Sequence, residues 1–166
     1  LITHARVEPA NRNDTWAVDP AIKDTESRGC KPKLLTADAA YGSDDNVVQA
    51  AGDEVELLTP PPATGPAPDK MTRDKFTLTD TECICPQGQI SRKLNWKKEA
   101  VTVEFDRETC LACPFKDKCQ THISNRRAYL KFTAKKARLT KRRTESKTDR
   151  FKNEYRYRAG IEAVSY

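Results

Sequence analysis

The sequence lacks any apolar stretch close to the roughly 20 residues that a membrane-spanning helix needs. It also lacks a charged-then-apolar leader at its start, which argues against secretion. Both absences predict a soluble, cytoplasmic protein without a membrane partner. There is no initiator methionine, and Tyr166 falls inside a predicted helix that has no stop signal. We therefore expect a fragment of a longer protein.

Acidic residues are scarce in one segment of the chain. Residues 121–158 hold 14 Lys and Arg against three acids, a net charge of +11. The remaining residues hold 16 basic and 21 acidic side chains, a net charge of −5. A basic segment on an otherwise acidic protein is typical of a nucleic-acid binder. The alternative is a solvated helix face.

Six cysteines are present, and five of them lie between residues 83 and 119. In a reducing compartment their short spacings favour a zinc site over a disulfide framework. The four preferred ligands are Cys85, Cys110, Cys113 and Cys119. Cys83 could replace Cys85, because residues two apart on a strand share a face, and His122 is a further candidate. The alternative is a set of reduced, partly buried thiols in a decayed ligand site, and Cys30 is interpreted as incidental.

The first 62 residues are predicted to alternate between strands and helices. We expect strands at 2–7, 33–38 and 54–59, and helices from an Asp14 cap to Gly29 and from a Ser43 cap to Gly52. The strand at 33–38 should be buried, and the second helix should turn Val47, Val48 and Ala51 to its apolar side. This alternation predicts an α/β layer with largely parallel pairing.

Five prolines between Pro60 and Asp69 mark a boundary. Beyond it, short alternating strands are expected at 76–78, 90–96 and 101–105, and one or two helices from about residue 135 to the end. We predict three segments. They are residues 1–62 as the first part of the core, 63–124 as a proline-rich linker with a cysteine-containing β insertion, and 125–166 as a basic segment with the C-terminal helix of the core.

Two polar features suggest a catalytic site. Asp38 ends a predicted strand, where open α/β sheets place their ligands, although such an acid can also simply begin a turn. Tyr155, Arg158 and Glu162 are offset by three and seven residues and so share one side of a helix. A carboxylate there can help to hold a divalent cation, and the Arg and Tyr can bond phosphate oxygens. An ordinary ion pair between Arg158 and Glu162 is the alternative.

These two features together resemble those of the DDE transposases of bacterial insertion sequences. The segment Asp38-Ala-Ala-Tyr41-Gly-Ser resembles their second-aspartate segment, and Tyr155-x-x-Arg158-x-x-x-Glu162 is similar to their C-terminal Tyr-Arg-Glu signature. The stretch from Val7 to Asp14 resembles the part of that family between its first and second acids. The cysteine module looks like an insertion found in one subgroup, so the resemblance spans nearly the whole chain.

The resemblance implies a ribonuclease-H-like core in which Asp38 and Glu162, with an upstream Asp, hold two Mg²⁺ ions. These ions would activate the attacking water or 3′-hydroxyl and stabilise the leaving oxygen during DNA strand cleavage and transfer. It further implies that Arg158 and Tyr155 position the DNA backbone. The first Asp of the family is expected before Leu1, and a Lys that usually follows the Glu is expected beyond Tyr166. The fragment alone should therefore be inactive.

DNA is the partner that the resemblance implies, as transposon ends and as target. The basic residues would neutralise phosphates without reading sequence; they include Arg126, Arg127, Lys135, Lys136, Lys141, Arg142 and Arg143. The full-length protein should be a homodimer in the bacterial nucleoid, because synapsis joins two transposon ends. The alternative is a non-catalytic zinc-ribbon nucleic-acid-binding protein or a decayed transposase remnant, in which Asp38 and Glu162 are incidental.

Overall fold

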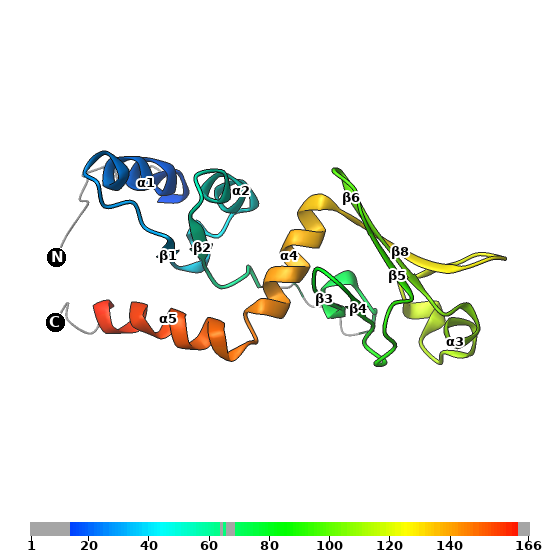
Figure 1. Cartoon of the computed structure of the whole chain (residues 1–166). Helices are drawn as coiled ribbons and strands as arrows, with labels where there is room; N and C mark the ends of the chain where they lie inside the picture. The colour runs from blue at the N-terminus through cyan, green and yellow to red at the C-terminus, as the bar shows by residue number, and fades with distance from the viewer. Residues whose placement is uncertain (1–13, 64, 66–68, 163–166) are drawn as a thin grey trace. The chain divides into compact units, whose positions relative to one another are not determined.

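The computed structural model describes residues 14–63, 65 and 69–162, and of residues 159–162 it describes only the helical backbone. The strand predicted at 2–7 therefore lies outside the described residues. The chain divides into two compact units, unit 1 (Leu1–Pro62 with Thr148–Tyr166) and unit 2 (Ala63–Lys147) (Figure 1). The three-segment division expected from the sequence stays a prediction. Within the described ranges, no helix combines the length and the apolarity needed to cross a membrane.

Unit 1 contains short strands and helices. They are η1 (Asp14–Ala17), α1 (Val18–Ser27), β1 (Leu34–Thr36), η2 (Ala39–Tyr41), α2 (Asp44–Gly52), β2 (Glu56–Leu58) and α5 (Asp149–Glu162). Strands β1 and β2 are joined through α2 and pair in parallel, with Leu35 opposite Leu57. Parallel pairing is thus confirmed for these two strands.

Local capping residues set the helix ends in unit 1. The Ser43 hydroxyl accepts a hydrogen bond from Asn46 N at 3.1 Å and starts α2, as predicted. Gly29 follows α1 with a φ of +72°, which a residue with a side chain rarely adopts. The prediction that Asp14 caps α1 is wrong, because Asp14 begins the 3₁₀ turn η1 and the residue before α1 is Ala17.

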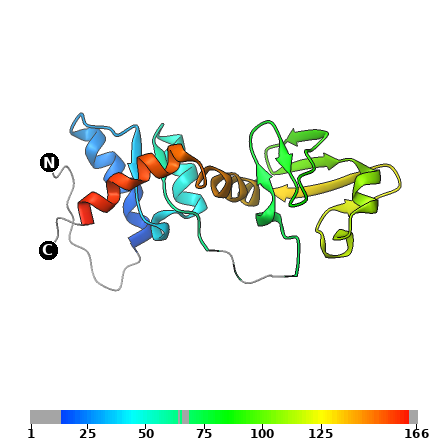
Figure 2. The ribbon, with the colours of Figure 1, turned by 90° about the horizontal axis from the view of Figure 1, so that it is seen from below.

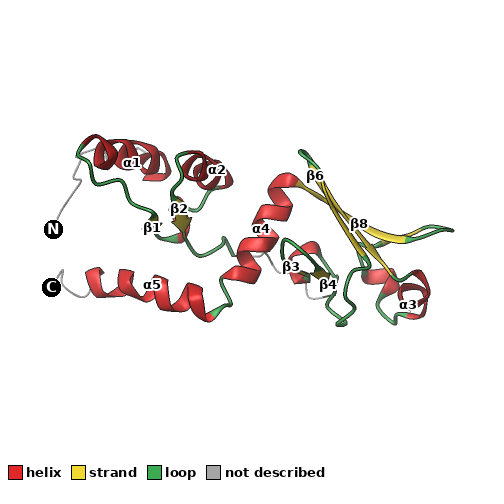
Figure 3. Cartoon of the chain, in the orientation of Figure 1, coloured by secondary structure: helices red, strands yellow, loops and turns green. Residues whose placement is uncertain are grey.

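The core of unit 1 lies between the β1–β2 pair and the helices α1 and α2, and α5 lies on the other side of the two strands (Figures 1 and 3). Its buried residues are Val18, Ile22, Ala50, Val55 and Leu57.

Two predictions about this core are wrong. Val48 is 47% exposed and Ala51 is exposed, because α2 turns Val47 and Ala50 inward and the next position on a helix lies about 100° around the axis. The strand β1 is half-buried rather than buried, since β2 is its only neighbouring strand among the described residues.

Unit 2 is built on antiparallel sheets. Its elements are η3 (Arg73–Lys75), β3 (Thr77–Leu78), β4 (Cys83–Ile84), β5 (Lys93–Trp96), β6 (Ala100–Phe105), α3 (Arg107–Ala112), η4 (Lys116–Lys118), β7 (His122–Ile123), β8 (Ala128–Thr133) and α4 (Ala134–Glu145). Strands β3 and β4 pair with each other, and the other four form a sheet in the order β5-β6-β8-β7. Figure 2 shows the strands of unit 2 in green to yellow. The described structure is therefore mixed α/β with mainly antiparallel sheets. One or two C-terminal helices were expected and two are present, α4 and α5, whereas strand β8 was not expected.

One face of the four-stranded sheet forms the core of unit 2. Alternate residues of β6 are buried, and Val101 and Val103 pair across the sheet with Phe132 and Leu130 of β8. Helix α4 adds Ala137 to the same cluster, and β3 and β4 add Leu78 and Cys83. Unit 2 thus has a hydrophobic core of its own, on the face covered by α4 and the β3–β4 pair.

Asp106 caps α3 and should make the stability of the protein depend on pH. Its carboxylate accepts hydrogen bonds from Thr109 N at 2.8 Å and Thr109 Oγ1 at 2.7 Å and pairs with Arg92, and the Thr109 bonds are the main cause of its lowered pKa. A carboxyl group whose pKa is lower in the folded state stabilises the fold at pH values above its pKa in the unfolded chain, about 3.9. That stability is lost as the pH falls through the pKa of the folded state. We expect Asp106→Ala to lower the melting temperature at pH 7, and the difference from wild type to shrink below about pH 4.

Thermal unfolding followed by circular dichroism at a series of pH values measures this effect. Asp117→Ala removes an exposed acid from the same unit and serves as the control. If the difference in melting temperature between Asp106→Ala and wild type were the same at pH 7 and pH 3, the lowered pKa of Asp106 would not be a source of pH-dependent stability.

Candidate active site around Asp38 and Arg158

Asp38 stands at the carboxyl end of β1. Ala37 N donates to Leu58 O at 3.1 Å, so extended pairing continues up to the residue before it. Asp38 Oδ1 accepts a hydrogen bond from Ala40 N at 2.8 Å and thereby caps η2. The side chain is still 41% exposed. The carboxylate is therefore fixed in position by the backbone and remains accessible to a ligand.

Helix α5 brings Arg158 to this carboxylate. Arg158 Nη2 lies 3.5 Å from Asp38 Oδ2, although the two residues are 120 positions apart in the sequence. Arg158 Nη1 donates to Tyr155 Oη at 3.0 Å, and the guanidinium lies 6.0 Å from the centre of the Tyr155 ring. Three of the residues predicted to form the site thus lie in one contact network within unit 1.

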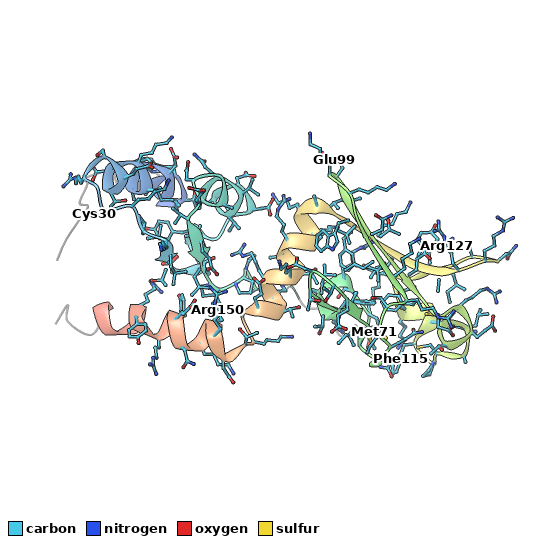
Figure 4. The ribbon with its side chains drawn as sticks, in the orientation of Figure 1. Cys30, Met71, Glu99, Phe115, Arg127 and Arg150 are labelled. Carbon is cyan, nitrogen blue, oxygen red and sulfur yellow. The ribbon has the colours of Figure 1, made fainter. Side chains whose placement is uncertain are left out.

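A second ion pair joins α5 to the strands of unit 1. Arg150 Nη2 lies 2.6 Å from Glu56 Oε2 of β2, and Glu56 and then Glu154 raise the pKa of Arg150 (Figure 4). This pair was not predicted from the sequence, because no local signal relates two residues that are 94 positions apart. Phe151 stacks on Tyr155 with ring centres 5.3 Å apart. These contacts hold the helix beside Asp38.

Glu162 is the last residue of α5, one turn beyond Arg158. Its side chain lies outside the described residues, so neither its predicted approach to Asp38 nor the alternative ion pair with Arg158 is tested. Phe151, Tyr155 and Arg158 are half-buried and recur at helical spacing. Glu162, four residues after Arg158, continues that series of positions on the same helix face.

Arg158 and Tyr155 of one helix lie beside Asp38, an acid that follows a strand. Such an arrangement suits the binding of a phosphate next to a carboxylate. Residues 84–165 match the family described as transposase DDE domain. The resemblance expected from the sequence is confirmed at this family level for these residues. The matched segment contains Tyr155, Arg158 and Glu162, whereas Asp38 precedes it. No curated protein matches the chain, and no solved structure matches it.

The matched segment, residues 84–165, also contains the basic residues of α4. Lys141 Nζ lies 2.7 and 2.8 Å from the two carboxylate oxygens of Asp80, so it takes part in an ion pair within unit 2. Arg142 and Arg143 are half-buried in the last turn of the helix, where cations also favour the helix dipole. The DNA contacts expected of these three residues stay a prediction.

Four cysteines of the same segment line one pocket of unit 2. They are Cys85, Cys110, Cys113 and Cys119, and Met71 and Phe115 add apolar walls to the pocket (Figure 4). Burial raises the pKa of Cys110 to about 11, with smaller contributions from the other three thiols. All six cysteines of the chain are free thiols. In the described part of the chain, no three His, Cys, Asp or Glu side chains are close enough together to hold a metal ion.

The alternative ligands lie elsewhere. Cys83 is fully buried in the core of unit 2, where burial raises its pKa to about 12, and it does not line the pocket. His122 is exposed and packs edge-on against Tyr129, with ring centres 5.0 Å apart. Cys30 is exposed in unit 1.

Proposed function

We propose that the chain is the C-terminal catalytic part of a DDE transposase from a bacterial insertion sequence, which cleaves and transfers DNA strands. The contact between Arg158 and Asp38, 3.5 Å across 120 residues of sequence, carries the proposal. It joins the Asp38 segment and the Tyr155–Glu162 motif, for each of which a purely structural explanation was also open. In addition, residues 84–165 match the transposase DDE domain family. Such a domain implies a ribonuclease-H-like core, interrupted here by the antiparallel, cysteine-containing insertion.

The acids of this site suit Mg²⁺. Asp38 offers an accessible carboxylate oxygen, and carboxylates are ligands that Mg²⁺ prefers. In the proposal Asp38 and Glu162 hold the metal together with a third acid from outside this sequence. When bound, a pair of Mg²⁺ ions would activate the attacking hydroxyl and stabilise the leaving oxygen of an in-line displacement.

Arg158 and Tyr155 would orient the DNA. A guanidinium presents a planar set of N–H donors that fits phosphate oxygens, and the hydrogen bond to Tyr155 Oη limits the motion of this one. A phosphodiester bound by Arg158 would therefore lie beside the carboxylate of Asp38. Lys141, Arg142 and Arg143 would add sequence-indifferent phosphate contacts. The full-length protein would act as a dimer on two transposon ends.

We further propose that the cysteine pocket holds a structural zinc ion. Zn²⁺ in structural sites takes four thiolate or imidazole ligands in a tetrahedron, and four thiols line this pocket. Three of them now bond to other groups: Cys85 accepts from Gln89 N, Cys110 donates to Gln89 Oε1 and Cys119 donates to Thr121 Oγ1. Binding would replace these weak thiol contacts by metal bonds and would release the thiol protons.

A strand-transfer assay tests the transposase proposal. The full reading frame that contains this sequence is expected to cut a labelled transposon end with Mg²⁺ and join it to target DNA, and EDTA should stop the reaction. The purified 166-residue chain should not nick DNA, since it supplies only two of the three proposed acids.

Robust Mg²⁺-dependent nicking by the 166-residue chain would contradict the need for a third acid. A folded full-length protein that binds DNA and zinc but leaves DNA uncut would instead favour the non-catalytic zinc-ribbon binder.

A further inference from the structure

The four-stranded sheet of unit 2 has a second face, opposite its core. Strand β6 exposes this face through alternate residues: Val101, Val103 and Phe105 are buried, and Thr102 and Glu104 between them are not. Lys131 pairs with Thr102 across the sheet and Lys93 pairs with Glu104, which places all four on the same face. The elements that cover the sheet, α4 and the β3–β4 pair, join the cluster on the other face.

This face is rich in cations. A shallow hollow on it is lined by seven residues, of which Lys93, Lys97, Arg127 and Lys131 are basic and one, Glu104, is acidic. Arg127 Nη1 donates to Glu104 Oε1 at 2.6 Å, so that pair is neutral. The three lysines are exposed, and none has a carboxylate partner within the residues that the structure describes. The hollow therefore carries three unpaired positive charges.

The aromatic ring of Tyr129 contacts two of the basic side chains on this face. The guanidinium of Arg127 lies 4.9 Å from the centre of the Tyr129 ring, and Lys131 Nζ lies 5.6 Å from it. Such cation–π contacts hold the basic side chains over the sheet. Arg127 extends from the start of β8 (Figure 4).

We propose that this sheet face, defined by Lys93, Lys97, Arg127, Tyr129 and Lys131, is a DNA-backbone-binding surface distinct from the candidate active site. Charge complementarity identifies the occupant as a polyanion: three unpaired cations, on β5, on β8 and in the loop after β5, fit a run of phosphates, and the hollow is polar. Lys93 and Lys97 lie outside the basic segment 121–158, so no pattern in the sequence groups them with Arg127 and Lys131. The inference rests on the proposed function for the choice of DNA over another polyanion.

The test measures the affinity of the 166-residue chain for a labelled duplex of arbitrary sequence by fluorescence anisotropy at several salt concentrations. The face variant is Lys93→Gln, Lys97→Gln and Lys131→Gln combined. It is expected to bind at least about tenfold more weakly at 0.1 M salt. Its slope of log K against log salt, which is negative, should become smaller in magnitude by about 0.9 for each lost contact, about 2.7 in total.

The control variant removes the same charge from elsewhere in unit 2, through Lys70→Gln, Lys116→Gln and Lys118→Gln, all exposed lysines outside this face. It should keep most of the affinity and slope, and equal melting temperatures for both variants would exclude misfolding. Equal losses in the two variants, or no loss in the face variant, would overturn the proposal. Neither outcome bears on strand transfer by the full reading frame. Absence of strand transfer with a selective loss of binding in the face variant would overturn only the transposase function.

Discussion

Under the proposed function, Asp38→Asn is expected to lower strand cleavage by the full reading frame by at least about 100-fold. Loss of a group that only supports a metal ligand costs about 10- to 100-fold, and loss of a ligand should cost more. Asparagine has the shape of aspartate and caps a helix as well, so its side-chain oxygen can keep the 2.8 Å hydrogen bond from Ala40 N. What disappears is the negative charge. A neutral amide is a poor ligand for Mg²⁺ and a poor partner for Arg158, whereas the fold around η2 should persist.

Asp45→Asn is the matched control. Asp45 is also a carboxylate of unit 1, exposed in the first turn of α2 and outside the network of Arg158. Cleavage and joining are measured with a labelled transposon end at saturating Mg²⁺, with circular dichroism to check that each variant is folded. Activity of folded Asp38→Asn within about twofold of wild type would remove Asp38 from the catalytic site and the transposase mechanism with it.

Protein purified without added metal is expected to contain about one zinc ion per chain, held by the four pocket cysteines. Cys113→Ser should weaken zinc binding by at least about 100-fold, since it removes a ligand rather than an outer-shell partner. Removal of zinc by a chelator should lower the melting temperature of the wild-type chain, because zinc bound only in the folded state adds its binding free energy to stability. Metal analysis by mass spectrometry and thermal unfolding measure the two effects.

Two cysteines outside the pocket provide the controls. Cys30→Ser removes an exposed thiol in unit 1 and should change neither the zinc content nor the melting temperature. Cys83→Ser places a hydroxyl in the core of unit 2, so it should lower the melting temperature and leave the zinc content unchanged. Well-folded wild-type protein with almost no zinc would contradict the zinc proposal. Loss of zinc in folded Cys83→Ser would show that Cys83 is one of the ligands.

Local interactions could be predicted because neighbours in sequence determine them. Ser43 bonds to Asn46 three residues away, Gly29 ends α1, and the alternation of apolar residues in β6 matches the two-residue period of a strand. Strand β8 was missed even though Ala128, Leu130 and Phe132 alternate in the same way, because it lies in the basic segment 121–158, whose charge is equally typical of a solvated surface.

The sequence alone determined the Ser43 cap of α2, most strands, the concentration of positive charge and the motifs that resemble a DDE transposase. Only the tertiary structure decided which of these features meet: Arg158 beside Asp38, four cysteines around one pocket, and Lys93 with Lys131 on an uncovered sheet face. The physical reason is that each of these arrangements depends on strand register and helix packing between distant segments. No periodicity within a single segment encodes them, whereas the folded core of each unit fixes the arrangements within that unit.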